Sequence, residues 1–139
     1  MIGAKERFLL DTNLVLVSLE APERLTARAR KLLLNDDLHV SVLTYWEVML
    51  KSMKGKLAVG DVQRWWSESL SLLQAVPVPL HPDHISAIAN LPAIHKDPFD
   101  RALLAQAAFE RLTLLTADAI LVKYASPLIR VVHAPIAGE

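Results

Sequence analysis

Short apolar runs alternate along the chain with segments in which apolar residues recur every three or four positions. The short runs predict strands, and the periodic segments predict amphipathic helices. The predicted strands are 7–10, 39–42, 75–80, 113–116 and 130–134. Four predicted helices are segments 22–35, 44–56, 81–91 and 119–125. A further helix is capped by Asp61 and carries Trp65, Trp66, Leu70 and Leu73, and another begins at Pro98.

This alternation of strands and helices is typical of a parallel sheet with helices on both faces. The sequence therefore predicts a three-layer α/β fold. We expect segment 75–80 at an edge of the sheet, because Pro77 and Pro79 cannot donate backbone hydrogen bonds to a neighbouring strand. Trp65 and Trp66 are adjacent and point in different directions on their helix, so they either pack beneath it or help to form a groove for a partner helix.

The composition narrows the class of protein. The 139 residues are 53% hydrophobic, enough for one domain over 1–139 with a substantial core. The formal net charge is zero, so contact with a polyanion must come from local basic clusters. The absence of cysteine excludes disulfides, thiolate catalysis and thiolate metal sites, and agrees with a reducing cytoplasm. No apolar stretch has the length of a signal peptide core or a membrane span, so we expect a cytoplasmic protein without membrane contact.

Acidic side chains follow two of the predicted strands. Asp11 comes directly after strand 7–10, and Asp118 comes after strand 113–116 and one alanine. In parallel α/β sheets, ligands bind beyond the carboxyl ends of the strands. If these two strands are neighbours, both carboxylates face one crevice. The helix headed by Asp97 and Asp100 leads into strand 113–116 and opens at the same edge, and Glu47 lies near the start of the helix after strand 39–42.

Each of these acids also has a purely structural explanation. Aspartate, serine and threonine cap helix N-termini, and acids in the first turn are stabilised by the helix dipole. Asp11, Asp97 and Asp118 would each cap a helix, and Pro98 would take the first helical position after Asp97. Thr44 and Glu47 would form a capping box, and Asp100 would lie in the first turn of its helix. Capping does not require the acids to converge, however. Clustered carboxylates repel unless a cation compensates them, and oxygen ligands without His or Cys favour Mg²⁺ or Mn²⁺ over zinc.

Four sequence blocks carry a resemblance to a known family. LLDTN (9–13), VLTYWEVMLK (42–51), HKDPFDRALLAQA (95–107) and LLTAD (114–118) resemble, in order and spacing, the blocks of PIN-domain ribonucleases. The chain is most similar to the VapC-type toxins of type II toxin–antitoxin systems. The resemblance implies a PIN-like five-stranded parallel sheet flanked by helices, Mg²⁺- or Mn²⁺-dependent cleavage of single-stranded RNA, a homodimer, and a cognate antitoxin protein as partner.

The resemblance also implies roles for individual residues. The catalytic and metal-binding acids would be Asp11, Glu47, Asp100 and Asp118. Thr12, Asn13 and Thr116 match polar positions that orient the carboxylates, and Asp97 matches an acid of this subgroup that shapes the helix start. A metal ion on Asp11 and Asp100, helped by Glu47, would lower the pKa of a bound water, while Asp118 would hold that ion through water or bind a second one.

Basic residues near these blocks have two explanations each. Arg101 would either contact an RNA phosphate or form a salt bridge with a neighbouring acid, and we expect the salt bridge. Lys51, Lys54 and Lys56 follow Glu47 and either track phosphates or form a solvated helix end. His95 is expected to be a surface residue rather than a proton donor.

Two other functions are compatible with the same sequence. One is a PIN nuclease that acts in RNA processing and is not a toxin. The other is a non-catalytic module that binds RNA or protein, although such a module would not need four acids at one edge of its sheet. Metal-dependent cleavage of single-stranded RNA would separate an enzyme from a binding module.

Overall fold

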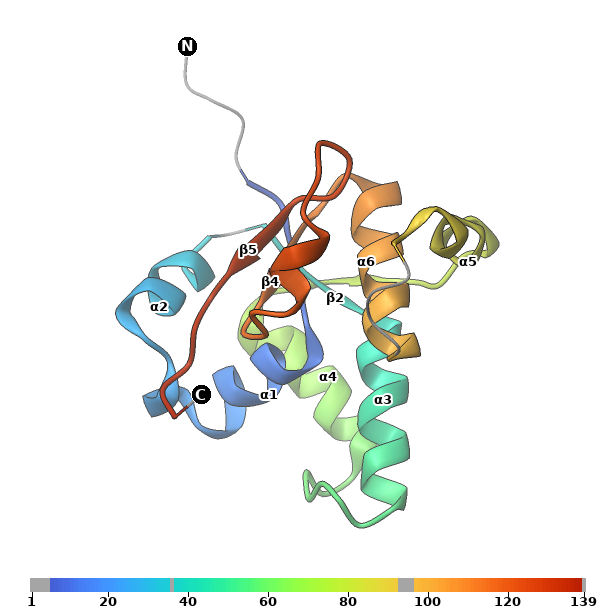
Figure 1. Cartoon of the computed structure of the whole chain (residues 1–139). Coiled ribbons are helices and arrows are strands. Elements are labelled where there is room, and N and C mark those ends of the chain that lie inside the picture. The colour runs from blue at the N-terminus through green and yellow to red at the C-terminus, as the bar shows by residue number, and fades with distance from the viewer. Residues whose placement is uncertain (1–5, 36, 93–96, 139) are drawn as a thin grey trace.

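Five parallel strands form one sheet in the computed structural model, which describes residues 6–35, 37–92 and 97–138 (Figure 1). The order across the sheet is β3-β2-β1-β4-β5, so the predicted parallel α/β sheet is confirmed. Strand β3 lies at an edge, as its prolines predicted. The strands are β1 (Phe8–Leu10), β2 (Leu38–Ser41), β3 (Val76–Val78), β4 (Thr113–Thr116) and β5 (Val131–His133).

Helices cover both faces of this sheet. The α-helices are α1 (Thr12–Glu20), α2 (Ala27–Leu33), α3 (Val42–Met53), α4 (Val62–Leu73), α5 (Pro82–Ala87) and α6 (Pro98–Glu110). Short 3-10 helices occur at Pro22–Arg24, Ile88–Asn90 and Leu121–Tyr124. None of the helices in the described ranges is both long and apolar enough to cross a membrane.

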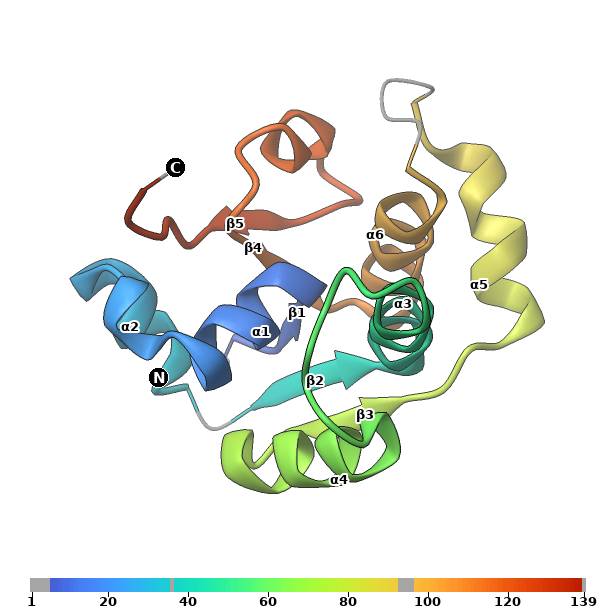
Figure 2. The ribbon, with the colours of Figure 1, turned by 90° about the horizontal axis from the view of Figure 1, so that it is seen from below.

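Alternating side chains of the strands divide the core into two clusters. Phe8 and Leu10 face one cluster, with side chains from α1, α2 and α4, whereas Leu9 faces the other, with side chains from α5 and α6. This alternation follows from the two-residue repeat of a strand. Helix α3 contributes Leu43 to one cluster and Val48 to the other. Figure 2 shows α3 beside α6, just beyond the end of β2.

Three predicted helices differ in form from the structure, and the predicted helix 44–56 is displaced towards the N-terminus, at Val42–Met53. Segment 22–35 is a 3-10 turn followed by α2, because Thr26 is extended and its hydroxyl caps α2 by accepting from the Ala29 amide at 3.1 Å. Segment 119–125 is only the 3-10 helix Leu121–Tyr124. Segment 81–91 is α5 followed by a second 3-10 turn.

Helix α1 is missing from the predicted series of elements, although the capping role of Asp11 implies a helix that begins just after it. Its buried residues Leu14, Val15 and Val17 come close together in the sequence, so they do not give the clear amphipathic repeat of a surface helix.

The two adjacent tryptophans of α4 both pack against the protein. Trp65 is buried in the cluster formed with α1 and α2. Trp66 is partly buried, and its ring stacks on Tyr45 of α3 with centroids 5.0 Å apart. Packing beneath the helix therefore accounts for both side chains.

Strand β4, which lies between β1 and β5, gives a direct test of this core. Leu114 is fully buried, so Leu114→Ala should lower the free energy of unfolding by about 2–5 kcal/mol through lost apolar contact and a cavity. Leu128→Ala is the matched control, because Leu128 is 84% exposed and its truncation should change stability by less than about 0.5 kcal/mol. Urea unfolding of both variants measures the difference, and equal losses would show that the two clusters are not the stabilising core.

Candidate active site

A cavity of about 550 Å³ lies at the edge of the sheet where β1 and β4 end. These strands pair side by side, with Leu10 opposite Leu115, so the residues that follow them meet at this edge. The predicted site residues that line the cavity are Asp11, Thr12, Asn13, Glu47, Lys51, Asp97, Asp100 and Asp118. The structure thus brings together acids from the end of β1, from α3, from the start of α6 and from the segment after β4.

Asp11 is the most enclosed acid of the cavity. Its carboxylate caps α1 by accepting from the Leu14 amide at 2.8 Å, and it also accepts a hydrogen bond from the Thr116 hydroxyl. Burial raises the pKa of Asp11 to about 6, against the effect of these two hydrogen bonds, and the neighbouring charges of Asp118 and Glu47 raise it further. Asp11 is therefore a helix cap and a cavity acid at once.

Thr116 connects the two strand ends. While its hydroxyl donates to Asp11, its oxygen accepts from the Asp118 amide at 2.9 Å. The Asp118 carboxylate in turn accepts from the Ile120 amide at 2.9 Å. The last residue of β4 thereby fixes the position of both acids, although it does not itself line the cavity.

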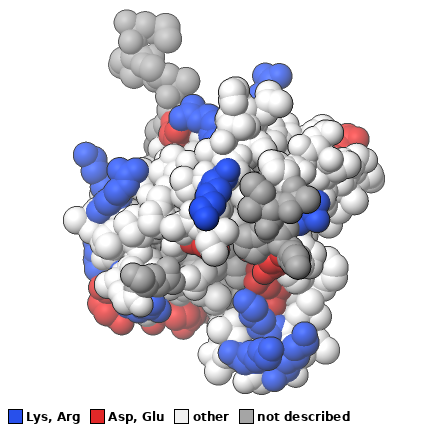
Figure 3. Space-filling model, in the orientation of Figure 1, with Lys and Arg blue, Asp and Glu red and all other residues white. Residues whose placement is uncertain are grey.

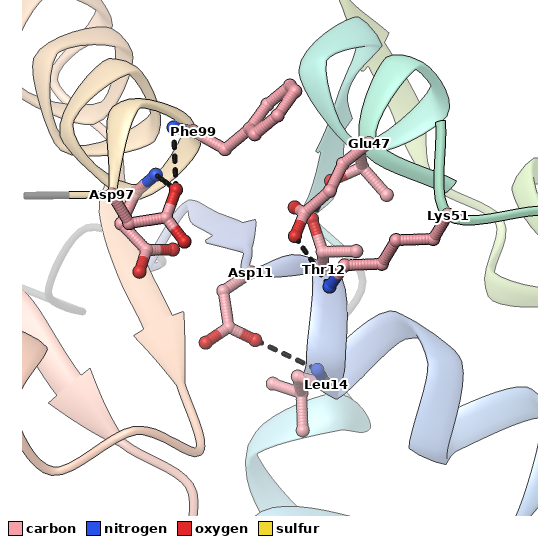
Figure 4. A network of polar contacts seen from close by, with 9 residues as sticks. Asp11, Thr12, Leu14, Glu47, Lys51, Asp97 and Phe99 are labelled. Atoms are coloured by element: carbon pink, nitrogen blue, oxygen red, sulfur yellow. Dashed lines mark hydrogen bonds and ion pairs between the residues drawn. The ribbon is translucent and has the colours of Figure 1, made fainter. Parts of the chain in front are cut away.

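Glu47 projects from α3 and is nearly buried. Its carboxylate forms an ion pair with Lys51, one helical turn further on, with Nζ and Oε2 2.9 Å apart (Figure 4). The proposed capping box of Thr44 and Glu47 is wrong, because α3 begins at Val42 and is capped by Ser41. Thr44 instead pairs with Thr12, with their hydroxyl oxygens 3.0 Å apart, and so joins α3 to α1 beneath the cavity.

The start of α6 supplies the remaining two acids. Asp97 is the N-cap, and its carboxylate accepts from the amides of Phe99 at 2.9 Å and Asp100 at 3.4 Å (Figure 4). Pro98 occupies the first helical position, as predicted. Asp100 is half-buried, and its pKa is raised to about 7, first by burial and then by the charges of Asp97 and Asp11.

The family profile described as PIN domain matches residues 8–127, which include every acid of this cavity. The chain belongs to the PIN domain family. This is a family of nucleases. No curated protein sequence matches the chain closely enough to add to that assignment.

Solved structures with a similar fold include toxin–antitoxin complexes. VapBC2 from Rickettsia felis, bound to a DNA fragment from its promoter, is 14% identical with a TM-score of 0.68, and the match covers 91% of this chain and 97% of that one. DNA-bound VapBC from Salmonella typhimurium is 18% identical with a TM-score of 0.65, over 92% and 98% of the two chains. A toxin–antitoxin complex from Klebsiella pneumoniae is 22% identical with a TM-score of 0.57, over 91% and 96%. At these identities the likeness establishes the fold.

The side chains that line the cavity of this PIN domain offer carboxylate oxygens, which are the ligands that hard divalent cations prefer. The polar lining is dominated by carboxylates, and the pKa values of Asp11 and Asp100 are raised first by burial and then by the charges of neighbouring acids. Within the described ranges, no group of three or more His, Cys, Asp or Glu side chains is arranged so that it could hold a metal ion as it stands.

Several predicted site residues lie away from the cavity lining. Arg101 forms no ion pair with any residue that the structure describes, and its Nε is buried without a hydrogen-bond partner there, so the expected salt bridge is wrong for this part of the chain. Lys54 and Lys56 are exposed beyond the cavity at the end of α3, where Figure 3 shows basic side chains gathered next to acidic ones. His95 lies outside the described residues.

The structure adds two residues that the sequence analysis did not assign to the site. His133, at the end of β5, lines the cavity and donates from Nε2 to the Ala117 carbonyl at 3.2 Å. Thr44 supports Thr12. The pairing of Lys51 with Glu47 was also missed, although the spacing of four residues on one helix is its sequence signal.

The electrostatics of Asp100 predict a pH-dependent effect of Asp100→Asn in EDTA. Because the folded pKa of Asp100 lies above its unfolded value, the folded wild type holds a proton that the unfolded chain releases, and stability falls as the pH rises from about 4 to about 7. Asn keeps the shape of the side chain without the charge. We therefore expect the variant to melt at or above the wild-type temperature near pH 8, and to lose this advantage near pH 5.

Asp83→Asn is the matched control for this measurement. Asp83 is an exposed acid in the first turn of α5, and it does not line the cavity. Its variant should show no advantage that grows with pH. If Asp100 were only a first-turn acid, Asp100→Asn would be less stable than wild type near pH 8, by roughly 0.5–1 kcal/mol from the lost interaction with the helix dipole.

Proposed function

We propose that this PIN domain is an endoribonuclease that depends on Mg²⁺ or Mn²⁺ and hydrolyses phosphodiester bonds of single-stranded RNA. The observation that carries the proposal is the convergence of acids from four separate elements in one cavity of a PIN fold. A fold alone does not define an activity, but a cluster of acids at the carboxyl edge of a parallel sheet is where metal-dependent phosphate chemistry is expected.

The residues that would hold the metal ion are Asp11, Glu47, Asp100 and Asp118. A divalent ion bound there would supply an activated water and charge stabilisation for phosphodiester hydrolysis. The protein itself fixes the carboxylates: Thr116 holds Asp11 and the Asp118 backbone, and the Leu14 and Ile120 amides bind the two carboxylates. We assign Thr12 and Asn13 the same orienting role at the cavity wall, and Asp97 the role of shaping the start of α6.

Lysines at the end of α3 are the proposed contacts to the RNA backbone. Lys54 and Lys56 are exposed just beyond the cavity, and the chain as a whole carries no net charge. A local basic cluster beside the acids would orient a polyanion without drawing it to the rest of the surface. Arg101, which has no ionic partner among the described residues, is a further candidate for a phosphate contact.

We further propose that the protein is a VapC-type toxin with a cognate antitoxin, acting in the cytoplasm on RNA. Similar folds solved as VapBC and other toxin–antitoxin complexes support this proposal. A PIN nuclease that works in RNA processing would have the same cavity. The two functions are separated by whether an antitoxin gene lies beside the gene of this protein.

Exposed apolar side chains on α3 support a homodimer. Trp46, Leu50 and Met53 are spaced by four and three residues and therefore lie on one face of the helix. Trp46 and Met53 are 54% and 76% exposed, and the Trp46 ring meets Phe99 of α6 edge-on at 5.2 Å. Exposed apolar patches of this kind mark protein interfaces.

The dimer can be tested by sedimentation equilibrium. Met53→Glu places a charge in the apolar face and should shift the wild-type dimer towards monomer. Leu128→Glu is the control, because Leu128 is 84% exposed on a different part of the surface and should leave the dimer intact. Monomeric wild type at micromolar concentration, or a dimer that both variants retain, would contradict this interface.

RNA cleavage tests the proposed activity. Wild type should cleave a single-stranded RNA in Mn²⁺ and not in EDTA. Asp11→Asn and Asp118→Asn should lose about 100-fold or more of the rate, since even the loss of an outer-shell partner of a metal ligand typically costs about 10- to 100-fold. Asn is preferred to Ala at position 11 because Asp11 caps α1, and Asn caps nearly as well. Both variants should keep the wild-type far-ultraviolet circular dichroism spectrum.

Asp83→Asn should cleave like wild type, since this exposed acid lies outside the cavity. Full activity of either cavity variant, or wild-type cleavage that is insensitive to EDTA, would contradict the proposed metal site. Wild type that binds RNA without cleaving it in any divalent metal would favour the non-catalytic module.

A further inference from the structure

One cation lies among the carboxylates of the candidate active site. Lys51 is the only lysine or arginine in the described part of the chain that lines the cavity, which is also lined by Asp11, Glu47, Asp97, Asp100 and Asp118. Its Nζ is 2.9 Å from Oε2 of Glu47. Figure 4 shows the Lys51 side chain running from α3 to the Glu47 carboxylate, on the side of the cavity where Thr12 lies.

The two partners of this ion pair differ in their freedom to move. The side chain of Glu47 is only 11% exposed, whereas that of Lys51 is 48% exposed. Glu47 is held against the protein, while the ammonium group of Lys51 can turn into solvent by rotating its flexible stem. The ion pair can therefore open without any change in the backbone of α3.

We propose that Lys51 is an exchangeable counter-cation, which neutralises Glu47 in the metal-free protein and is displaced towards an RNA phosphate when a divalent ion enters. This inference rests on the proposed metal-dependent nuclease function, which it deepens. A lysine ammonium and a divalent ion compete for the same carboxylate charge, so Lys51 lowers the affinity of the cavity for metal. Once released, the same ammonium group is a monovalent partner for phosphate at the mouth of the cavity.

The two roles of Lys51 predict effects of opposite sign for Lys51→Gln. Removal of the competing charge should tighten Mn²⁺ binding by roughly three- to thirtyfold, the scale on which one unit charge about 4–12 Å away affects a divalent ion in water. Removal of a phosphate contact should weaken binding of a short phosphorothioate oligouridine in Mn²⁺ by about two- to fivefold. Isothermal titration calorimetry measures the first affinity and fluorescence anisotropy the second.

Lys54→Gln is the matched control, because Lys54 lies on the same end of α3 but does not line the cavity. It should share the weaker oligonucleotide binding but change the Mn²⁺ affinity by less than about twofold, since exposed charges further away are screened. A substitution with a merely structural effect would not tighten metal binding and weaken oligonucleotide binding together.

The outcomes separate this inference from the proposed function. If wild type binds no Mn²⁺, the proposed metal-dependent function fails. If wild type binds Mn²⁺ and Lys51→Gln binds it with equal or lower affinity, the metal site stands and competition by Lys51 is overturned. If Lys51→Gln binds Mn²⁺ more tightly but the oligonucleotide equally well, the transfer of Lys51 to phosphate is overturned.

Discussion

The parallel pairing of β1 with β4 is the constraint on which the candidate active site depends. The register places Leu10 opposite Leu115, and the Asp11 amide extends the ladder by donating to the Leu115 carbonyl at 3.0 Å. A shift of one residue would turn Phe8 and Leu10 away from the cluster that they fill and would turn Leu9 away from the other cluster, so the packing on both faces of the sheet would be lost. The apolar core therefore enforces the register, and the register brings Asp11 to Thr116.

Capping and chemistry prove to be compatible roles for the same acids. Asp11 caps α1 and Asp97 caps α6, yet both carboxylates also line the cavity. The reason is geometric, because in a parallel α/β fold the helix that follows a strand begins at the carboxyl edge of the sheet, where ligands bind. Backbone amides at a helix start favour negative charge, so these positions stabilise carboxylates that would otherwise repel one another.

The remaining repulsion is visible in the electrostatics of the cavity. Burial and neighbouring acids raise the pKa values of Asp11 and Asp100, so hydrogen bonds and helix starts do not fully compensate the charge. Among the described residues that line the cavity, Lys51 supplies a positive charge beside these acids. A protein that keeps several acids close together gives up stability for their proximity, which is the pattern expected of a functional site rather than of helix caps alone.

Much of the architecture was predictable from the sequence because it depends on local patterns. Five apolar runs separated by helical segments predicted the parallel sheet, the prolines of β3 predicted its edge position, and the acids after strands predicted where chemistry would lie. The start of α2 was not predictable, since a single capping hydroxyl, that of Thr26, decides it. The 3-10 form of segment 121–124 has no side-chain cap that the sequence could have signalled. The pairing of Thr12 with Thr44 and the hydrogen bonds of Thr116 are tertiary contacts across 32 and 105 residues.

The sequence by itself thus determined which residue types follow which strands. Only the tertiary structure decided that Asp11, Glu47, Asp100 and Asp118 share one cavity, and that Arg101 does not pair with an acid in the described part of the chain. The physical reason is that hydrophobic periodicity specifies local elements, whereas the distance between two charges depends on the strand order and register that the whole core selects.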